Sequence, residues 1–151
     1  MTKKNSALVL KKTTDFDRRS FLWRPMAKGN EINDDLLLIY KTFKKYKLID
    51  KNTTLLTFCE VFKGRELEKI KVKINWTGSL RLLIYFFVRL AHRHHIISNS
   101  DSQWIQLEKT FLWKQKPIKR EYSAEIFSKL YTYKSEPKNA IIIEDILRQL
   151  F

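Results

Sequence analysis

One stretch near the middle of the chain limits the fold more than any other, because a strand pattern runs directly into a helix pattern. Residues 69–76 alternate between polar and apolar side chains, with a period of two that is typical of a half-buried strand. Thr77-Gly78-Ser79 then breaks the alternation and supplies hydroxyls that can cap a helix. Residues 80–91 are apolar at all but two positions, which predicts a central helix surrounded by the rest of its domain.

The composition favours helices around this element. The chain has 151 residues, 44% of them hydrophobic and 13% aromatic, enough for one packed domain. Only three glycines and three prolines argue against a turn-dense all-β fold. We therefore predict a mostly α fold of about six helices, with a minor β element at Lys69–Trp76.

Amphipathic spacing places the other helices. Apolar residues at helical intervals predict a first helix from about Asn33 to Tyr46, capped by Asn33 or Asp34. Cys59 falls on the apolar stripe of the next helix, so we interpret it as a small buried hydrophobe rather than a nucleophile. The same spacing predicts the remaining helices over residues 53–62, 103–111, 122–133 and 137–150.

The domain organisation has two interpretations. Residues 1–30 are strongly basic and predict an N-terminal arm, mobile at first and packed on the domain from Phe21 to Met26. Residues 31–151 form a single helical domain, or two half-units at 31–75 and 76–151. Each half-unit reads as helix, isoleucine-rich connector, shorter helix and basic extended segment, the outline of a winged helix-turn-helix. Two unrelated amphipathic hairpins would give the same pattern.

The charge indicates the class of partner. Thirty Lys and Arg residues against sixteen Asp and Glu give a net charge of +14, which favours nucleic acid or an anionic membrane. The longest unbroken apolar run, Leu82–Val88, is too short for a membrane span, so no membrane partner is expected. A single cysteine and the absence of a secretory pattern predict a cytoplasmic protein.

The cations fall in four clusters that predict contacts with phosphates, most simply those of duplex DNA. One cluster is the N-terminal arm, and Trp113, beside a lysine, is a candidate for stacking on a base. The predicted nucleic-acid-binding residues are Lys41, Lys44, Lys45, Lys69, Lys71, Lys73, Trp113, Lys114, Lys116, Lys119 and Arg120. The helices near Thr53–Phe62 and Gln103–Phe111 are the candidates for a recognition helix. The competing interpretation is that scattered lysines only solvate a helical surface.

The sequence contains no recognisable catalytic motif. There is no phosphate-binding loop, dinucleotide glycine pattern, nucleophile elbow or metalloprotease histidine motif. His92, His94 and His95 lie close together in sequence but lack further ligands for a tetrahedral metal site. We therefore predict no enzyme, no catalytic residue, no metal and no cofactor; a nuclease whose carboxylates meet only in three dimensions is the alternative.

A sequence motif adds a family resemblance. Ile74-Asn75-Trp76-Thr77-Gly78-Ser79, followed by Leu83-Ile84-Tyr85 and Leu90, resembles the C-terminal region of RteC-type regulators of conjugative transposons. The resemblance spans residues 70–151 and implies a helical, winged-helix DNA-binding region that controls genes of a mobile element. Together with the charge, it predicts a non-enzymatic DNA-binding or regulatory protein. The alternative is a protein-interaction module with an acidic partner, and the oligomeric state is left open.

Overall fold

The fold is mostly α-helical with a small sheet, as predicted. The computed structural model describes residues 18–25, 31–93, 95–97, 102–133 and 136–150. The α-helices of this described part are α2 Ile32–Lys45, α3 Leu55–Glu60, α4 Leu80–His92, α5 Ser102–Thr110, α6 Arg120–Tyr133 and α7 Ala140–Gln149. Its strands are β1 Leu22–Trp23, β2 Ile74–Trp76, β3 Ile96–Ile97, β4 Phe111–Trp113 and β5 Lys116–Pro117, and Leu67–Lys69 forms a 3-10 turn, η1.

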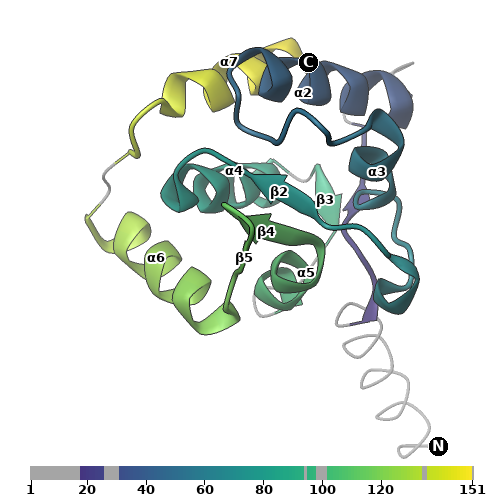
Figure 1. The fold of residues 1–151 in the computed structure, drawn as a ribbon. Coiled ribbons are helices and arrows are strands. Elements are labelled where there is room, and N and C mark those ends of the chain that lie inside the picture. The colour runs from purple at the N-terminus through teal and green to yellow at the C-terminus, as the bar shows by residue number, and fades with distance from the viewer. Residues whose placement is uncertain (1–17, 26–30, 94, 98–101, 134–135, 151) are drawn as a thin grey trace, which may run out of the picture.

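Helix α4 is the centre of the molecule (Figure 1). Its hydroxyl cap is Ser79, whose side chain accepts a hydrogen bond from the backbone N–H of Leu82. The helix lies between α2 and α7 at the top of the view and α5 below, with α6 at the left. Seven of its thirteen residues are buried, and Phe87 alone contacts the rings of Phe21, Phe62 and Phe111. The predicted central helix is therefore confirmed.

The three-stranded sheet joins two segments that are far apart in sequence. Strand β2 pairs in parallel with β4, so that Ile74 lies opposite Phe111 and Trp76 opposite Trp113. Parallel pairing needs a long crossover, which α4 and α5 supply. Strand β5 then pairs antiparallel with β4 through a tight turn. The order helix, helix, strand thus occurs twice, as α2-α3-β2 and α4-α5-β4; an internal duplication stays a prediction.

The predicted strand at Lys69–Trp76 is wrong over its first half. Lys69 ends the turn η1, and the strand begins only at Ile74. Val72, expected on the buried face, has 60% of its surface exposed. The reason is that β4 is only three residues long and offers partners to Ile74–Trp76 alone. The residues before Ile74 lie against α5 instead, where Lys73 Nζ donates to the carbonyl of Glu108 at 3.3 Å.

Several helix ends also differ from the sequence prediction. Helix α2 begins at Ile32, so neither Asn33 nor Asp34 caps it, and α7 begins three residues after Pro137. Glu144 of α7 binds Arg89 with Nε–Oε1 of 2.8 Å and accepts a hydrogen bond from the Tyr85 hydroxyl at 2.6 Å. This cluster joins α4 to α7, which an isolated helical pattern cannot reveal.

Residues 18–25 pack on the helical domain. Phe21 and Trp23 are buried, and β1 pairs antiparallel with β3. Trp23 stacks on His95 with ring centroids 5.1 Å apart and donates its indole N–H to the buried carboxylate of Asp35. Met26 and residues 1–17 lie outside the described residues, so the division into an arm and a domain stays a prediction.

Candidate nucleic-acid interface

Two basic turns meet at the carboxyl ends of β2 and β4. The backbone N–H of Lys114 donates to the carbonyl of Trp76 at 2.8 Å. The neighbouring Thr77 donates its hydroxyl to the carbonyl of Lys47 at 2.7 Å and its N–H to that of Leu48 at 2.8 Å. The turn after α2 and the tip of the β4–β5 hairpin are therefore both fixed to the same two residues, Trp76 and Thr77.

The hairpin tip adopts a conformation that its residues disfavour. Lys114 and Gln115 have φ values of 50° and 67°, in the left-handed region that a two-residue hairpin turn requires and that glycine or asparagine fills most easily. Such a conformation costs a non-glycine residue about 1–2 kcal/mol. The surrounding structure enforces it, because the N–H of Gln115 donates to Asn75 Oδ1 at 2.7 Å. Lys47 is left-handed as well, with φ of 56°.

We name the cations in these two turns and directly beside them the hairpin edge. It consists of Lys44, Lys45, Lys47, Lys51, Lys114 and Lys116. Within residues 44–52 and 113–117 the only carboxylate is Asp50. Hydrogen bonds from the Asn52 backbone and the Asn75 side chain lower the pKa of Asp50 below its ordinary value. The hairpin edge therefore has a large positive excess, and its one carboxylate is already engaged.

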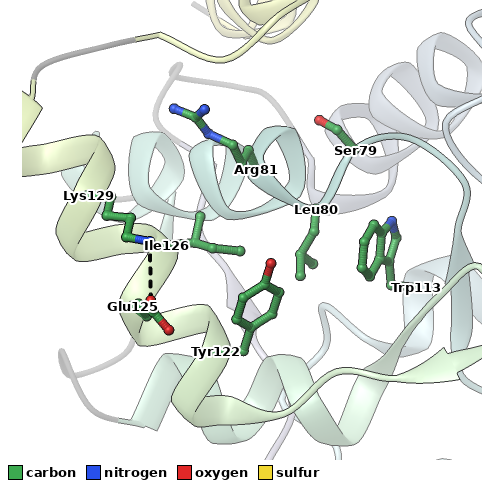
Figure 2. Close-up of a pocket in the computed structure, with 8 residues that line it drawn as sticks. All are labelled: Ser79, Leu80, Arg81, Trp113, Tyr122, Glu125, Ile126 and Lys129. Carbon is green, nitrogen blue, oxygen red and sulfur yellow. Dashed lines mark ion pairs between the residues drawn. The ribbon is translucent and has the colours of Figure 1, made fainter.

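Trp113 lies behind the hairpin edge and is half-buried. Its indole N–H donates to the carbonyl of Gly78 at 3.0 Å, and Lys114 Nζ lies 5.5 Å from its ring centroid. Trp113 lines an open cavity of about 490 Å³ between the start of α4, β4 and α6 (Figure 2). The other lining residues are Ser79, Leu80, Arg81, Tyr122, Glu125, Ile126 and Lys129.

The Trp-Thr-Gly-Ser turn is what brings these features together. Gly78 has no room for a side chain, because an added Cβ would lie 2.7 Å from Leu48 Cδ2 and 3.2 Å from the Trp76 indole. This close approach places the Gly78 carbonyl against Trp113 while Ser79 caps α4. Each residue of the motif that resembles RteC-type regulators thus has a local structural role.

The predicted cluster at Lys69, Lys71 and Lys73 lies at the opposite end of β2. It borders a cavity of about 780 Å³ that we name the amino-end cavity, lined by Arg18, Arg19, Glu66, Leu67, Glu68, Ile70, Lys73 and Lys109. Here the cations have acidic neighbours, and Lys69 forms an ion pair with Glu66 at 3.6 Å. The interpretation of these lysines as one face of a strand is wrong, and they do not extend the hairpin edge.

The remaining predicted residues differ in what they offer to a ligand. Lys41 and Lys119 are exposed on the surface. Lys44 is half-buried and donates to the carbonyls of Asp50 and Lys51 at 3.0 and 2.6 Å, so part of its role is to hold the turn. Arg120 is bound to Glu108 with Nη2–Oε2 of 2.6 Å. Burial alone would raise the pKa of Glu108, but the hydrogen bonds from Arg120 lower it overall.

Neither proposed recognition helix presents a polar exposed face. In α5, Gln103, Gln106 and Thr110 are buried, and the Gln106 amide donates to the carbonyls of Arg19 and Ser20. Helix α3 has only six residues, and its most exposed side chain is the apolar Leu56, at 70%. The surface therefore favours contact with the backbone of a nucleic acid over reading of base edges.

Sequence reasoning missed the residues that organise the site. Asn75 was assigned only to a basic strand face, yet its amide links Asp50 to Gln115 across two turns. Tyr122 begins a helix that amphipathic spacing predicts, yet it has 49% of its surface exposed beside Trp113. The one available signal was the polar Asn75 between two buried residues of β2, since a polar side chain there needs hydrogen-bond partners.

The described part of the chain contains neither a metal-binding group nor a membrane-spanning helix. None of its His, Cys, Asp and Glu side chains form a group of three or more that could hold a metal ion. His95 is fully buried against Trp23, and His94 lies outside the described residues. Cys59 is buried as predicted, and burial raises the pKa of its thiol. Among the described helices, none is long and apolar enough to cross a membrane.

Comparisons with known proteins add no assignment to this geometry. No family model, curated protein or solved structure matches the chain. The resemblance to RteC-type regulators therefore stays a prediction. A function for this chain can be inferred only from the residues of the site itself.

Proposed function

We propose that the protein is a non-enzymatic DNA-binding protein that holds the phosphate backbone of duplex DNA at the hairpin edge. The observation that supports this most is the attachment of Lys47 and Lys114, on turns 67 residues apart in sequence, to the adjacent residues Trp76 and Thr77. Lysines gathered in this way neutralise several phosphates at once and release their counterions, which drives binding without sequence preference.

The backbone conformation of the hairpin edge supports a functional role for its side chains. Lys47, Lys114 and Gln115 all occupy the left-handed region, at a cost that glycine would avoid. Strain retained in exposed polar residues is common at binding sites, where the side chain itself is needed. Two of these three residues are lysines, so two of the strained positions also carry a charge.

The mode of contact follows from the exposed elements. The β4–β5 hairpin and the turn after α2 are exposed at their tips, whereas α5 is enclosed. We infer a protein whose affinity is mainly electrostatic, with a regulatory role in a mobile element resting on the sequence resemblance alone. The salt titration described next distinguishes DNA binding from binding to an acidic protein.

A salt titration tests the proposal. Binding to a mixed-sequence DNA duplex is measured by fluorescence anisotropy across a range of salt concentrations. We expect log K to fall linearly with log salt, with a slope of roughly −0.9 for each phosphate contacted. No binding to the duplex at low salt would contradict the proposal and leave the acidic protein partner as the better interpretation.

A further inference from the structure

The cavity beside the hairpin edge has aromatic walls and an apolar floor. Figure 2 shows Leu80 between the side chains of Trp113 and Tyr122, with Ile126 next to them. Tyr122 is 49% exposed although it is a large aromatic residue on an amphipathic helix. The Trp113 indole N–H is used by the Gly78 carbonyl, so the ring offers no free donor. Such walls suit a flat ring more than a flexible chain.

The charges around the cavity select against a cationic ligand. Arg81 stands at its rim on the first turn of α4, and Lys129 is paired with Glu125 at 3.2 Å. Register places Lys116 opposite Trp113 in the β4–β5 pair, so the two side chains lie on the same face of the hairpin. Lys114 Nζ is near the same ring. An aromatic pocket with this surplus of cations complements a flat ring that has a phosphate attached to it.

We propose that this cavity binds an unpaired nucleobase of the nucleic acid strand whose phosphates lie on the hairpin edge. The inference rests on the proposed function and extends it from the phosphate backbone to a single base. A volume of about 490 Å³ is within the range of small-molecule pockets. A paired base inside a duplex has both faces stacked on its neighbours, so only a base at a tail, gap or flipped position can enter.

The position of the cavity supports this choice of occupant. Trp113 is the last residue of β4, and Lys114 begins the tip of the hairpin edge. The cavity and the phosphate-binding cations are therefore adjacent along the chain and share a hairpin. A strand that crosses the hairpin edge can place one base against Trp113 and Tyr122 without leaving the lysines.

The experiment compares a blunt DNA duplex with the same duplex extended by a short single-stranded tail that contains a fluorescent adenine analogue. We expect the tailed duplex to bind about tenfold more tightly than the blunt one, because stacking on aromatic side chains favours the unpaired base. Stacking should also quench the analogue. Equal affinities for the two duplexes, or an unquenched tail, would overturn the proposal.

Two variants of one exposed residue separate stacking from structure. Tyr122→Leu removes the ring, and we expect it to abolish the preference for the tail. Tyr122→Phe retains the ring and should retain the preference. A preference that survives Tyr122→Leu in a folded variant, verified by its thermal unfolding, would contradict the base pocket.

Two further binding measurements test the base pocket independently of the proposed binding to duplex DNA. A single-stranded oligonucleotide with the same analogue tests the cavity without a duplex, so quenching that depends on Tyr122 supports the pocket even if the blunt duplex does not bind. Adenosine monophosphate tests whether the cavity binds the base of a free nucleotide or the base of a nucleic acid strand. If it binds as tightly as the single strand, the cavity belongs to a free nucleotide and the strand proposal is overturned.

Discussion

The two ends of the β2–β4 pair are both basic, yet they differ in how their cations are held. At the hairpin edge, Lys47 and Lys114 have left-handed backbone conformations, and Asp50, the single carboxylate, is held by Asn52 and Asn75. At the amino-end cavity, Glu66 and Glu68 stand among the cations, and Lys69 forms an ion pair with Glu66. Positive charge at the first end is available to a partner, whereas charge at the second is partly balanced within the protein.

The difference shows that net charge and clustering in sequence are insufficient to locate a binding surface. Lys69, Lys71 and Lys73 are the most regular basic pattern in the chain, yet the structure gives them acidic neighbours and no continuous strand. Lys47 is absent from the predicted binding residues, yet Thr77 holds its carbonyl, and Asn75 links the neighbouring Asp50 to Gln115 at the hairpin tip. What distinguishes the two ends is the placement of the carboxylates.

The largest expected effect comes from neutralising lysines of the hairpin edge. The triple variant Lys47→Gln, Lys114→Gln and Lys116→Gln should weaken duplex binding by about 10²-fold at 0.1 M salt, since each lost phosphate contact removes roughly 0.9 from the salt slope. Fluorescence anisotropy against salt measures both quantities.

The charge-matched control for that variant lies at the other end of the strands. Lys69→Gln, Lys71→Gln and Lys109→Gln removes the same number of charges from the neighbourhood of the amino-end cavity. We expect only a small loss of affinity, because these cations lie beside glutamates. Equal losses for the two triple variants would show that only net charge matters.

The next effect concerns His95, whose ring stacks on Trp23 beside the β1–β3 pair. Burial lowers the pKa of His95 below its ordinary value, although the Arg24 carbonyl and Asp35 oppose this. Below about pH 6.5 the unfolded chain therefore binds a proton that the folded chain does not, so stability should fall as the pH decreases through this range, by at most about 1.4 kcal/mol per pH unit. Urea unfolding at successive pH values measures the slope.

The control for this pH effect is His95→Gln, which removes the titrating group. Its stability should vary less between pH 7.5 and 5.5 than that of the unchanged protein, whatever its absolute value. Glu108 and Glu144 have lowered pKa values, so their contributions are lost only at more acidic pH. A slope that persists in His95→Gln would assign the effect to another group.

A smaller effect should appear when the carboxylates of the amino-end cavity are removed. Glu66→Gln with Glu68→Gln leaves Arg18, Arg19 and Lys109 without acidic neighbours in the cavity, and we expect duplex binding to become about fivefold tighter at low salt. The matched control is Glu31→Gln with Asp34→Asn, which makes the same change in net charge at the exposed start of α2. Equal gains for both pairs would contradict a role for local compensation.

The smallest effect is a gain in stability at the hairpin tip. Gln115→Gly relieves a left-handed residue, and we expect stabilisation by about 0.5–1 kcal/mol after the entropy cost of glycine is subtracted. Duplex affinity should stay unchanged because no charge is lost. A loss of stability in urea unfolding would show that the Gln115 side chain makes a contribution beyond its backbone.

Much of the fold could be predicted from local patterns. The apolar run at residues 80–91 and the Ser79 cap specify α4, because a helix apolar on most sides must be enclosed. The strand at Lys69–Trp76 was overestimated, since alternation does not reveal how long the partner strand is. The parallel pairing of β2 with β4 has no local signal either, because it joins residues 37 positions apart.

The candidate site was predictable only in part. Lys114, Lys116 and Trp113 could be named from a basic segment with an aromatic residue beside it. The contributions of Lys47, Asn75 and Tyr122 depend on contacts between distant turns and on the side of α6 that stays exposed. These contacts arise from the tertiary structure, and the helical spacing of residues 122–133 does not reveal the open cavity beside Tyr122.

The most direct test of the hairpin edge is a titration of the isotopically labelled protein with a mixed-sequence duplex, followed by amide chemical shifts in nuclear magnetic resonance spectra. We predict that the largest shifts fall on residues 45–52 and 113–117, with little change at Arg18, Arg19 and Lys109. Shifts concentrated around the amino-end cavity would contradict the account.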